Sequence, residues 1–424
     1  MTFLLSALRV VIIGLFVKHA ACEVPNAQKV LSPTGHDAGS DKVLEAQFGF
    51  NISWRDYNNF TVEEALGGSF NYNNVEGMVA LVKGDPNQPH SAEVLVKATS
   101  PDQSTLDCIE LSNDKASLRF LTKPGCTSIS PKVHIDIVVA VRPGTLQFGN
   151  VGTHVASRFL DIIVWRELYF ETYMMTLRSQ YGDVGCQETS SFAAHDITVA
   201  SDFGKITGNW SLPRSISFST IAGEIDLDLP PKRWSSGPSS LGALTATSKT
   251  GNINIRMPFE LGQLSLRNLT TNIVTDAGAV HANIVHGAVT HIQTVTGSIN
   301  ATLLPYWAFY QFQGVQFNYI TTVCNVCSTH VNVLTPSDNY YAIPALFFAR
   351  SKHVADTGNM VLTYPKEWAG VAEWKVDIGA AKISGGDFEV IEDGGLSGKI
   401  QRRPLGSKLF AGVKVGALDL TMKA

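Results

Sequence analysis

Three carboxylates, Glu224, Asp226 and Asp228, form the densest acidic group between residues 195 and 303. Two carboxyl groups held about 5–9 Å apart can hydrolyse a glycosidic bond. On a strand, Asp226 and Asp228 share a face and lie about 7 Å apart, so distance alone permits this chemistry. A catalytic site also needs a base and an orienting group around the reacting atom, and the sequence offers no such set. We therefore interpret the acidic strip as a solvated face.

Three histidines, His281, His286 and His291, recur every five residues and raise the question of a metal site. On strands, a five-residue step places alternate members on opposite faces. The sequence predicts His281 and His291 on the outside and His286 beside a turn at Gly287, all of them solvated. We expect neither a metal nor any other cofactor.

The cysteines favour disulfides over zinc. Cys324-x-x-Cys327 could form half of a zinc site, but no second Cys or His pair stands at a suitable spacing. A disulfide between these two residues, or one of them paired with Cys186, is the preferred interpretation, and the partner stays open. Cys108 and Cys126 flank a strand-like stretch and a turn, and we expect them to form a disulfide.

Other motifs of enzymes are lacking. The run Gly394–Lys399 is similar to a phosphate loop but has no Ser or Thr after the lysine, which favours a glycine-rich turn. The sequence contains no HExxH, Gly-x-Ser-x-Gly or dinucleotide-binding motif. The net charge of −4 gives no basic surface for nucleic acid. The sequence therefore predicts a protein that is not an enzyme and does not bind nucleic acid.

The elements that position these residues belong to an internal repeat. Its unit is Ser/Thr/Asp-x-x-Gly-x-Ile/Val, and its glycines stand at positions 204, 223, 251, 278 and 297. The glycines are 19 to 28 residues apart, which is typical of one solenoid rung per unit. The glycine suits a turn with positive φ, and the hydroxyl three residues earlier can bond to the turn backbone.

Alternation after each glycine separates two faces. Period-2 alternation predicts a buried set comprising Ile225, Leu227, Ile253, Ile255 and Ile299, and an exposed set comprising Asp226, Asn254, His281 and Asn300. One unit cannot bury its apolar face alone, whereas a stack can. The sequence therefore predicts an all-β fold, a β-solenoid-like stack of short strands with Gly turns.

The rest of the chain suggests a domain order. With 44% apolar and 17% charged residues, the chain can bury a large core. Short Val- and Phe-rich runs favour strands throughout, including the ambiguous segment 159–181. The expected order is a signal peptide or signal-anchor (1–22), a flexible leader (23–45), an N-terminal β region (46–190), the β-strand-repeat array (191–304), an aromatic insertion or cap (305–327) and C-terminal β-strand repeats (328–424).

The aromatic segment 305–327 is the candidate ligand surface. Tyr306, Trp307, Phe309 and Tyr310 could cover the open end of the stack, or they could form an exposed surface that binds sugars or partners. If the protein binds a ligand, we predict that these rings bind it rather than the acidic strip.

The N-terminus predicts an extracellular location. An apolar run, Val10–Val17, is followed by Lys18 and small residues, as in a secretory signal, and Arg9 leaves an uncleaved anchor as the alternative. Five Asn-x-Ser/Thr sequons fit secretion and are possible N-glycosylation sites: Asn51, Asn59, Asn209, Asn268 and Asn300. The protein is expected to be secreted or on the cell surface, touching a membrane only through an uncleaved anchor.

The repeats 219–229, 246–257 and 294–303 resemble a β-strand-repeat family of adhesin-like proteins, found in bacteria and as secreted or membrane-tethered fungal proteins. The resemblance implies a β-solenoid-like fold and an adhesive role at the cell surface, and no catalytic residues. The partner would be a glycan, the cell wall or a matrix protein. The alternatives are a polysaccharide-acting enzyme on a parallel β-helix and a purely structural cell-wall component.

Overall fold

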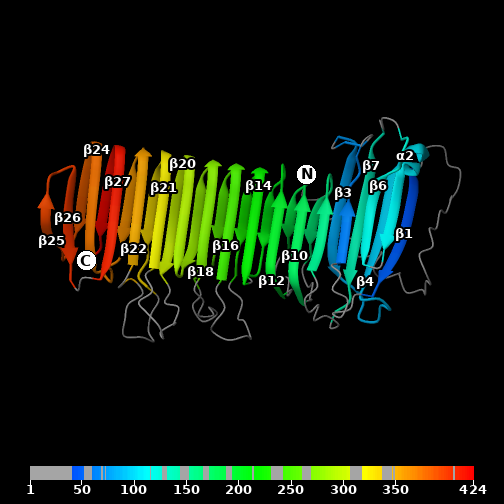
Figure 1. The fold of residues 1–424 in the computed structure, drawn as a ribbon, viewed down its shortest axis with the longest axis horizontal. Coiled ribbons are helices and arrows are strands. Elements are labelled where there is room, and N and C mark those ends of the chain that lie inside the picture. The colour runs from blue at the N-terminus through cyan, green and yellow to red at the C-terminus, as the bar shows by residue number, and fades with distance from the viewer. Residues whose placement is uncertain are drawn as a thin grey trace. The chain divides into compact units, whose positions relative to one another are not determined.

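A computed structural model (Figure 1) describes most of the chain from residue 41 onward. The described residues are 41–51, 60–67, 70–71, 73–114, 116–126, 131–143, 152–165, 171–187, 193–212, 214–230, 242–259, 269–305, 318–336, 346, 349–403 and 406–424. They are nearly all β, which confirms the all-β, solenoid-like prediction. Within these ranges no helix is long and apolar enough to cross a membrane.

Two compact units make up the chain. Unit 1 comprises Met1–Met174 and Ser190–Ala193, and unit 2 comprises Met175–Thr189 and Ala194–Ala424. The strand β10 (Glu171–Ser179) lies at the boundary in sequence. Together with β9 it places strands in the segment 159–181, as predicted.

Unit 1 contains two strand ladders. The first has the order β1 (Lys42–Phe50), β4 (Ala92–Ser100), β7 (Val133–Val141), β3 (Val75–Lys83) and β9 (Asp161–Val164). The second has the order β8 (Gly152–Ser157), β2 (Phe60–Glu64), β6 (Ser117–Thr122) and β5 (Ile109–Asp114).

Two features of unit 1 differ from the sequence-based expectation. The strand β1 begins at Lys42, inside the predicted leader 23–45, because Leu44 and Ala46 alternate into the core. A short helix, α2 (Gln103–Asp107), was not predicted, and the Asp102 carboxylate accepts from the Ser104 backbone N–H at its start. Five residues give no periodicity by which such a helix could be recognised.

Unit 2 is a stack of rungs, each made of two strands that meet at a turn. One sheet contains β12 (Ala193–Ser201), β14 (Ser215–Ala222), β16 (Gly242–Thr250) and β18 (Leu269–Ala277) in parallel order. The facing sheet contains β11 (Val184–Cys186), β13 (Ile206–Asn209), β15 (Ile225–Asp228), β17 (Ile253–Arg256) and β19 (Val280–His286). We call the turn between the two strands of a rung its corner.

The core of the stack follows the predicted alternation. Ile225, Leu227, Ile253, Ile255 and Ile299 are each at most 1% exposed, which confirms the buried set. His281 and Asn300 are exposed, as predicted. Asp226 and Asn254 are only half-exposed, because polar side chains of neighbouring positions lie against them.

The stack continues beyond the predicted array. The long strands β20 (Val289–Pro305) and β21 (Asn318–Val333) each pass through a corner and pair in parallel. Residues 318–327 therefore form part of a rung, so the prediction of an insertion or cap is wrong for them. Tyr306, Trp307, Phe309 and Tyr310 lie outside the described residues.

The last rungs are out of sequence order. β22 (Ala349–Thr357) and β23 (Met360–Tyr364) pair with β27 (Ser407–Met422), which in turn pairs along its whole length with β24 (Gly370–Gly385). Beyond β24 stand β26 (Ser397–Arg402) and then β25 (Glu389–Asp393), both in antiparallel pairing (Figure 1). The strand β27 is thus inserted between elements that precede it in the chain.

Candidate functional site

A ladder of hydroxyl groups connects the corners of successive rungs. The Ser201 hydroxyl accepts from the backbone N–H of Gly204 at 2.8 Å and donates to the carbonyl of Gly182, one rung earlier, at 2.9 Å. The same inter-rung bond recurs from Thr220 at 3.4 Å, Ser248 at 3.3 Å, Thr275 at 3.1 Å and Thr294 at 3.1 Å. The repeat motif therefore encodes a hydrogen bond from each corner to the previous one, whereas the bond inside the corner belongs to Ser201 and Gly204, because the N–H groups of Gly223, Gly251 and Gly278 donate to backbone carbonyls of the next rung.

The glycine of the motif is required by close backbone approach. A Cβ at Gly251 would lie 1.9 Å from the carbonyl oxygen of Gly223 in the preceding rung. Its φ of +150° is also a conformation that side chains disfavour. The corners can stack at sheet spacing only because they carry no side chain at this position.

Beside the corner ladder lies an open groove of about 310 Å³ on the β14–β16–β18 face. One side is a row of small outward side chains, Ser219, Thr247 and Val274. The other side carries the charged corner residues Asp202, Lys249 and Asp276, together with Ile221. The groove forms because Ser219, Thr247 and Val274, which are neighbours on adjacent strands, all have short side chains.

The charges of the groove are of both signs. Arg178 approaches the Asp202 carboxylate at 3.8 Å, which offsets its charge in part. Lys249 and Asp276 are exposed on adjacent strands, between the paired positions Ser248–Thr275 and Thr250–Ala277. The groove therefore offers both hydrogen-bond acceptors, the carboxylates, and donors, the ammonium group and the hydroxyls. A polyol needs both kinds of group to bind its own hydroxyls.

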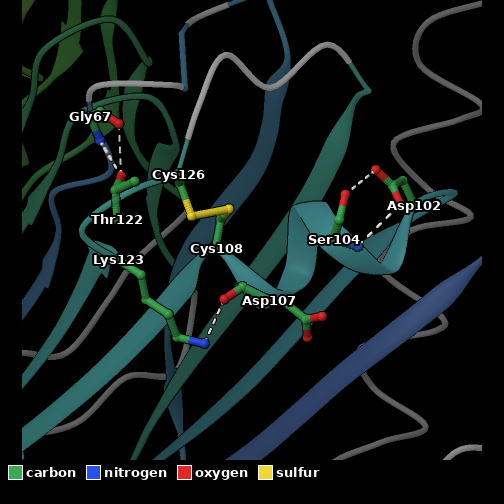
Figure 2. Close-up of a disulfide and its surroundings, with 8 residues drawn as sticks. All are labelled: Gly67, Asp102, Ser104, Asp107, Cys108, Thr122, Lys123 and Cys126. Carbon is green, nitrogen blue, oxygen red and sulfur yellow. Dashed lines mark hydrogen bonds between the residues drawn. A yellow bond between two sulfur atoms is a disulfide. The ribbon is translucent and has the colours of Figure 1, made fainter.

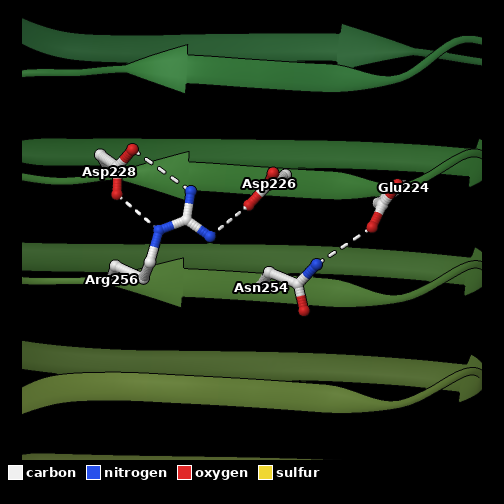
Figure 3. Close-up of polar contacts among 5 residues, drawn as sticks. All are labelled: Glu224, Asp226, Asp228, Asn254 and Arg256. Atoms are coloured by element: carbon white, nitrogen blue, oxygen red, sulfur yellow. Dashed lines mark hydrogen bonds and ion pairs between the residues drawn. The ribbon is translucent and has the colours of Figure 1, made fainter.

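An arginine forms ion pairs with two carboxylates of the acidic strip (Figure 3). The Arg256 guanidinium donates to Asp228 at 2.6 Å and to Asp226 at 2.7 Å, while Asn254 donates to Glu224 at 3.0 Å. The hydrogen bonds that Arg256 donates to Asp228, and then to Asp226, raise the pKa of Arg256 above its usual range. Because both aspartates are paired with a permanent cation, this geometry matches a solvated ion-pair cluster better than an acid–base pair.

The histidines occupy three different environments. His281 is exposed, and His291 is half-buried at 3.3 Å from Gln293. The expectation that His286 is solvated is wrong: it is fully buried at the end of β19, with Nδ1 2.8 Å from the Thr290 hydroxyl. Burial lowers the pKa of His286 to about 4 and keeps the ring neutral. In the described part of the chain, no three His, Cys, Asp or Glu side chains could hold a metal ion.

A second buried histidine was missed by sequence reasoning. His353 is fully buried, with Nδ1 2.8 Å from the Thr322 hydroxyl and Nε2 2.8 Å from the Tyr364 hydroxyl. Burial lowers the pKa of His353 to about 3 and raises that of Tyr364 above its usual range. The sequence did contain a signal for this buried cluster, because His353, Thr322 and Tyr364 all stand at inward positions in the alternation of their strands.

Cys108 and Cys126 are joined by a disulfide of 2.12 Å beside α2 (Figure 2). Cys324 and Cys327 form a second disulfide, so the alternative of a pairing with Cys186 is wrong. Cys186 is buried and belongs to neither disulfide. Peptide mapping under non-reducing conditions should recover Cys108 and Cys126 in one linked fragment. Recovery of both residues as free thiols would contradict this disulfide.

Register explains the Cys324–Cys327 spacing. Cys324 lies beside Thr294 and Cys327 beside Gly297, so the two cysteines occupy the hydroxyl and glycine positions of the corner motif. This rung was not recognised in the sequence because both defining residues of the motif are replaced. A covalent bond within the corner stands where other rungs have the hydroxyl.

The asparagines of three of the five sequons lie in the described residues. Asn300 is exposed in the second half of β20, and Asn51 is exposed next to His90 after β1. Asn209 is half-buried on β13. Asn59 and Asn268 lie outside the described residues. N-glycosylation stays a prediction, and accessibility favours Asn300 and Asn51 as acceptors.

Comparisons with known proteins give remote similarities only. No family model and no curated protein matches the chain. Among solved structures, it is similar to a "putative adhesin" from Bacteroides fragilis (10% identity, TM-score 0.30, covering 90% of this chain and 98% of that one). It is also similar to a "putative adhesin" and to a "putative lipid binding protein" from Parabacteroides distasonis, at 9% and 7% identity. For the adhesin the TM-score is 0.28, and the alignment covers 90% of this chain and 98% of that one. For the lipid binding protein the TM-score is 0.29, and the alignment covers 88% of this chain and 96% of that one. At this distance the similarities carry no conclusion about function.

Proposed function

We propose that this chain is a non-enzymatic, adhesin-like binding protein of the cell surface or extracellular space, and that it binds carbohydrate in the groove beside the corner ladder. The observation that carries the proposal is the groove beside the corner ladder, where Lys249 lies between Asp202 and Asp276 and next to the outward hydroxyls of Ser219 and Thr247. Sugars are recognised by such alternating donors and acceptors. The groove's mixed charge favours a neutral glycan over a strongly acidic one.

The main rival is an enzyme acting on polysaccharide. Its best candidate acid–base pair, Asp226 and Asp228, is bonded to Arg256, which supports the binding role instead. A second rival is a wall component without a discrete ligand. A screen of the purified protein against glycans and matrix proteins separates this rival from an adhesin, because only the adhesin shows saturable binding.

The groove is tested with Lys249→Ala and Asp276→Ala, compared with Lys352→Ala on the same face but outside the groove. Loss of glycan binding in the first two variants alone supports the proposal. Equal binding in all three variants contradicts the groove as the site. Incubating the glycan with the protein and analysing its chain length tests the enzyme at the same time, since a binding protein leaves the glycan intact.

The aromatic segment is tested with Trp307→Ala, measured for glycan binding and thermal stability together. Lost binding at an unchanged melting temperature supports a recognition role for the segment. A lowered melting temperature supports a covering role, which is the result we expect, because the apolar interior of a solenoid needs covering.

A further inference from the structure

The strand β24 has one edge that is only half paired. On one side β27 pairs with it from Gly370 to Gly385. On the other side β26 pairs only with Gly370–Lys375, and one further bond joins the Val376 N–H to the Leu396 carbonyl. Within the described chain, no strand pairs with residues 377–385 on this side. Exposed edges of this kind are templates for another strand.

Apolar side chains next to this edge are uncovered. Leu418 and Leu420 on β27 are at most 1% exposed, whereas their β24 neighbours Ala381 and Ile383 are half-exposed. On β25, Val390 pairs with the buried Ile400 and so shares its core-facing side, yet it is 54% exposed. We call the unpaired edge 377–385, together with Ala381, Ile383 and Val390, the terminal step.

We propose that the terminal step accepts an extended peptide segment of another protein, which adds to β24 as one further parallel strand. Such strand addition draws affinity from main-chain hydrogen bonds and specificity from alternate side chains. The new strand would cover Ala381 and Ile383 on the open side of β24. On the other side of β24, the paired residues Leu418 and Leu420 of β27 are already buried.

Charge and register define the sequence of the incoming segment. On the paired side, Asp419 lies 3.7 Å from Lys382, and the Thr421 hydroxyl lies 3.1 Å from that of Ser384. A segment on the open side meets the same Lys382 and Ser384. It should therefore read apolar, acidic, apolar, Ser/Thr, which is the pattern of Leu418–Thr421.

A second copy of this chain does not fit the terminal step. Strands β25 and β26 extend past β24 in the facing sheet (Figure 1). Two copies paired antiparallel through residues 377–385 around a two-fold axis would bring both projecting hairpins into the same space. A single strand avoids this clash.

The test uses a fluorescent peptide with the sequence of residues 416–422 (GALDLTM) and the full-length protein, with binding followed by fluorescence anisotropy. We expect saturable binding to the wild-type protein and several-fold weaker binding to Lys382→Glu. A peptide with Lys in place of its Asp should bind Lys382→Glu better than the wild-type protein. Lys352→Glu, the same charge change on β22, should bind the original peptide like the wild-type protein.

Three results would overturn the proposal. The first is no saturable binding of the peptide to a folded wild-type protein. The second is binding that does not respond to the exchange of charges between Lys382 and the peptide. The third is a protein that sediments as a dimer in the wild-type form and as a monomer in Lys382→Glu, because a second copy would then occupy the edge.

Discussion

The Thr294 hydroxyl donates to the Gly278 carbonyl at 3.1 Å, and the residue beside Thr294 in the next rung is Cys324. The chain of inter-rung hydroxyl bonds that runs from Ser201 to Thr294 therefore stops at the Cys324–Cys327 disulfide. Later rungs keep the corner glycine, at Gly358, Gly416 and Gly379, but have apolar residues at the hydroxyl position. The stack thus uses different means to hold its corners on the two sides of this rung.

Removing one hydroxyl should destabilise the stack measurably. Ser201→Ala leaves the Gly204 N–H and the Gly182 carbonyl without their buried partner, so we expect a loss of about 1–3 kcal/mol in the free energy of unfolding. Ser217→Ala, an outward residue of β14, is the matched control and should cost under about 0.5 kcal/mol. Urea titration measures both, and equal losses would contradict a structural role of the corner hydroxyl.

A side chain at a corner glycine should be worse still. Gly251→Ala places a Cβ 1.9 Å from the Gly223 carbonyl oxygen, so the rungs must separate. The control is Gly395→Ala, where φ is +75° and nothing lies within 4 Å of the new Cβ. The control should cost about 1–3 kcal/mol from backbone strain alone. If Gly251→Ala costs no more than the control, close stacking is not what selects glycine.

The disulfide in β21 should be replaceable by the repeat motif. Cys324→Ala with Cys327→Ala removes a small loop closure, and we expect a loss of about 2 kcal/mol under oxidising conditions. Cys324→Thr with Cys327→Gly restores the hydroxyl and the glycine, and should recover about 1 kcal/mol of this loss. Chemical denaturation compares the variants. The idea fails if the Thr–Gly variant is no more stable than the Ala–Ala variant.

Acid should destabilise unit 2 through its buried histidines. The folded-state pKa values of His286, about 4, and His353, about 3, lie below the ordinary value of 6.5, so the unfolded chain binds protons first. Each ring therefore contributes no pH dependence above about pH 6.5 and removes about 1.4 kcal/mol of stability per pH unit as the pH falls below it. The loss for His286 ends near pH 4.

The pH effect can be assigned with two variants. His286→Leu should lower the slope of unfolding free energy against pH by about 1.4 kcal/mol per unit between about pH 6 and 4.5. His281→Gln, at an exposed position, should leave the slope unchanged. An unchanged slope in His286→Leu would mean that the buried ring is not neutral in the folded protein.

The repeat register made much of unit 2 predictable. Period-2 alternation after each glycine placed Ile253 and Ile255 inside, because the two faces of a strand differ in polarity. The rung of β21 escaped notice because Cys324 and Cys327 fulfil the roles of hydroxyl and glycine by different chemistry. The groove could not be predicted, because it depends on which outward residues become neighbours across strands whose paired positions are 19 to 28 residues apart. Those distances are set by loop length rather than by local pattern.

Polar residues in the core were the other gap. His286 and His353 alternate inward like the aliphatic residues around them, but a rule that treats histidine as solvated overrides the register. Their burial is possible because Thr290, Thr322 and Tyr364 stand within hydrogen-bond distance. His353 and Thr322 are 31 residues apart in the sequence, and they become neighbours only through the pairing of β21 with β22 in the stack.

The insertion of β27 between β23 and β24 has a consequence for assembly of the fold. Rungs up to β22 and β23 can add one after another as the chain emerges, because each needs only the rung before it. The segment β24 cannot dock in the same way, since its neighbour, residues 407–422, comes later in the chain. Residues 370–402 can therefore join the stack only after the C-terminal strand has been made, although β24, β26 and β25 can pair with one another before that.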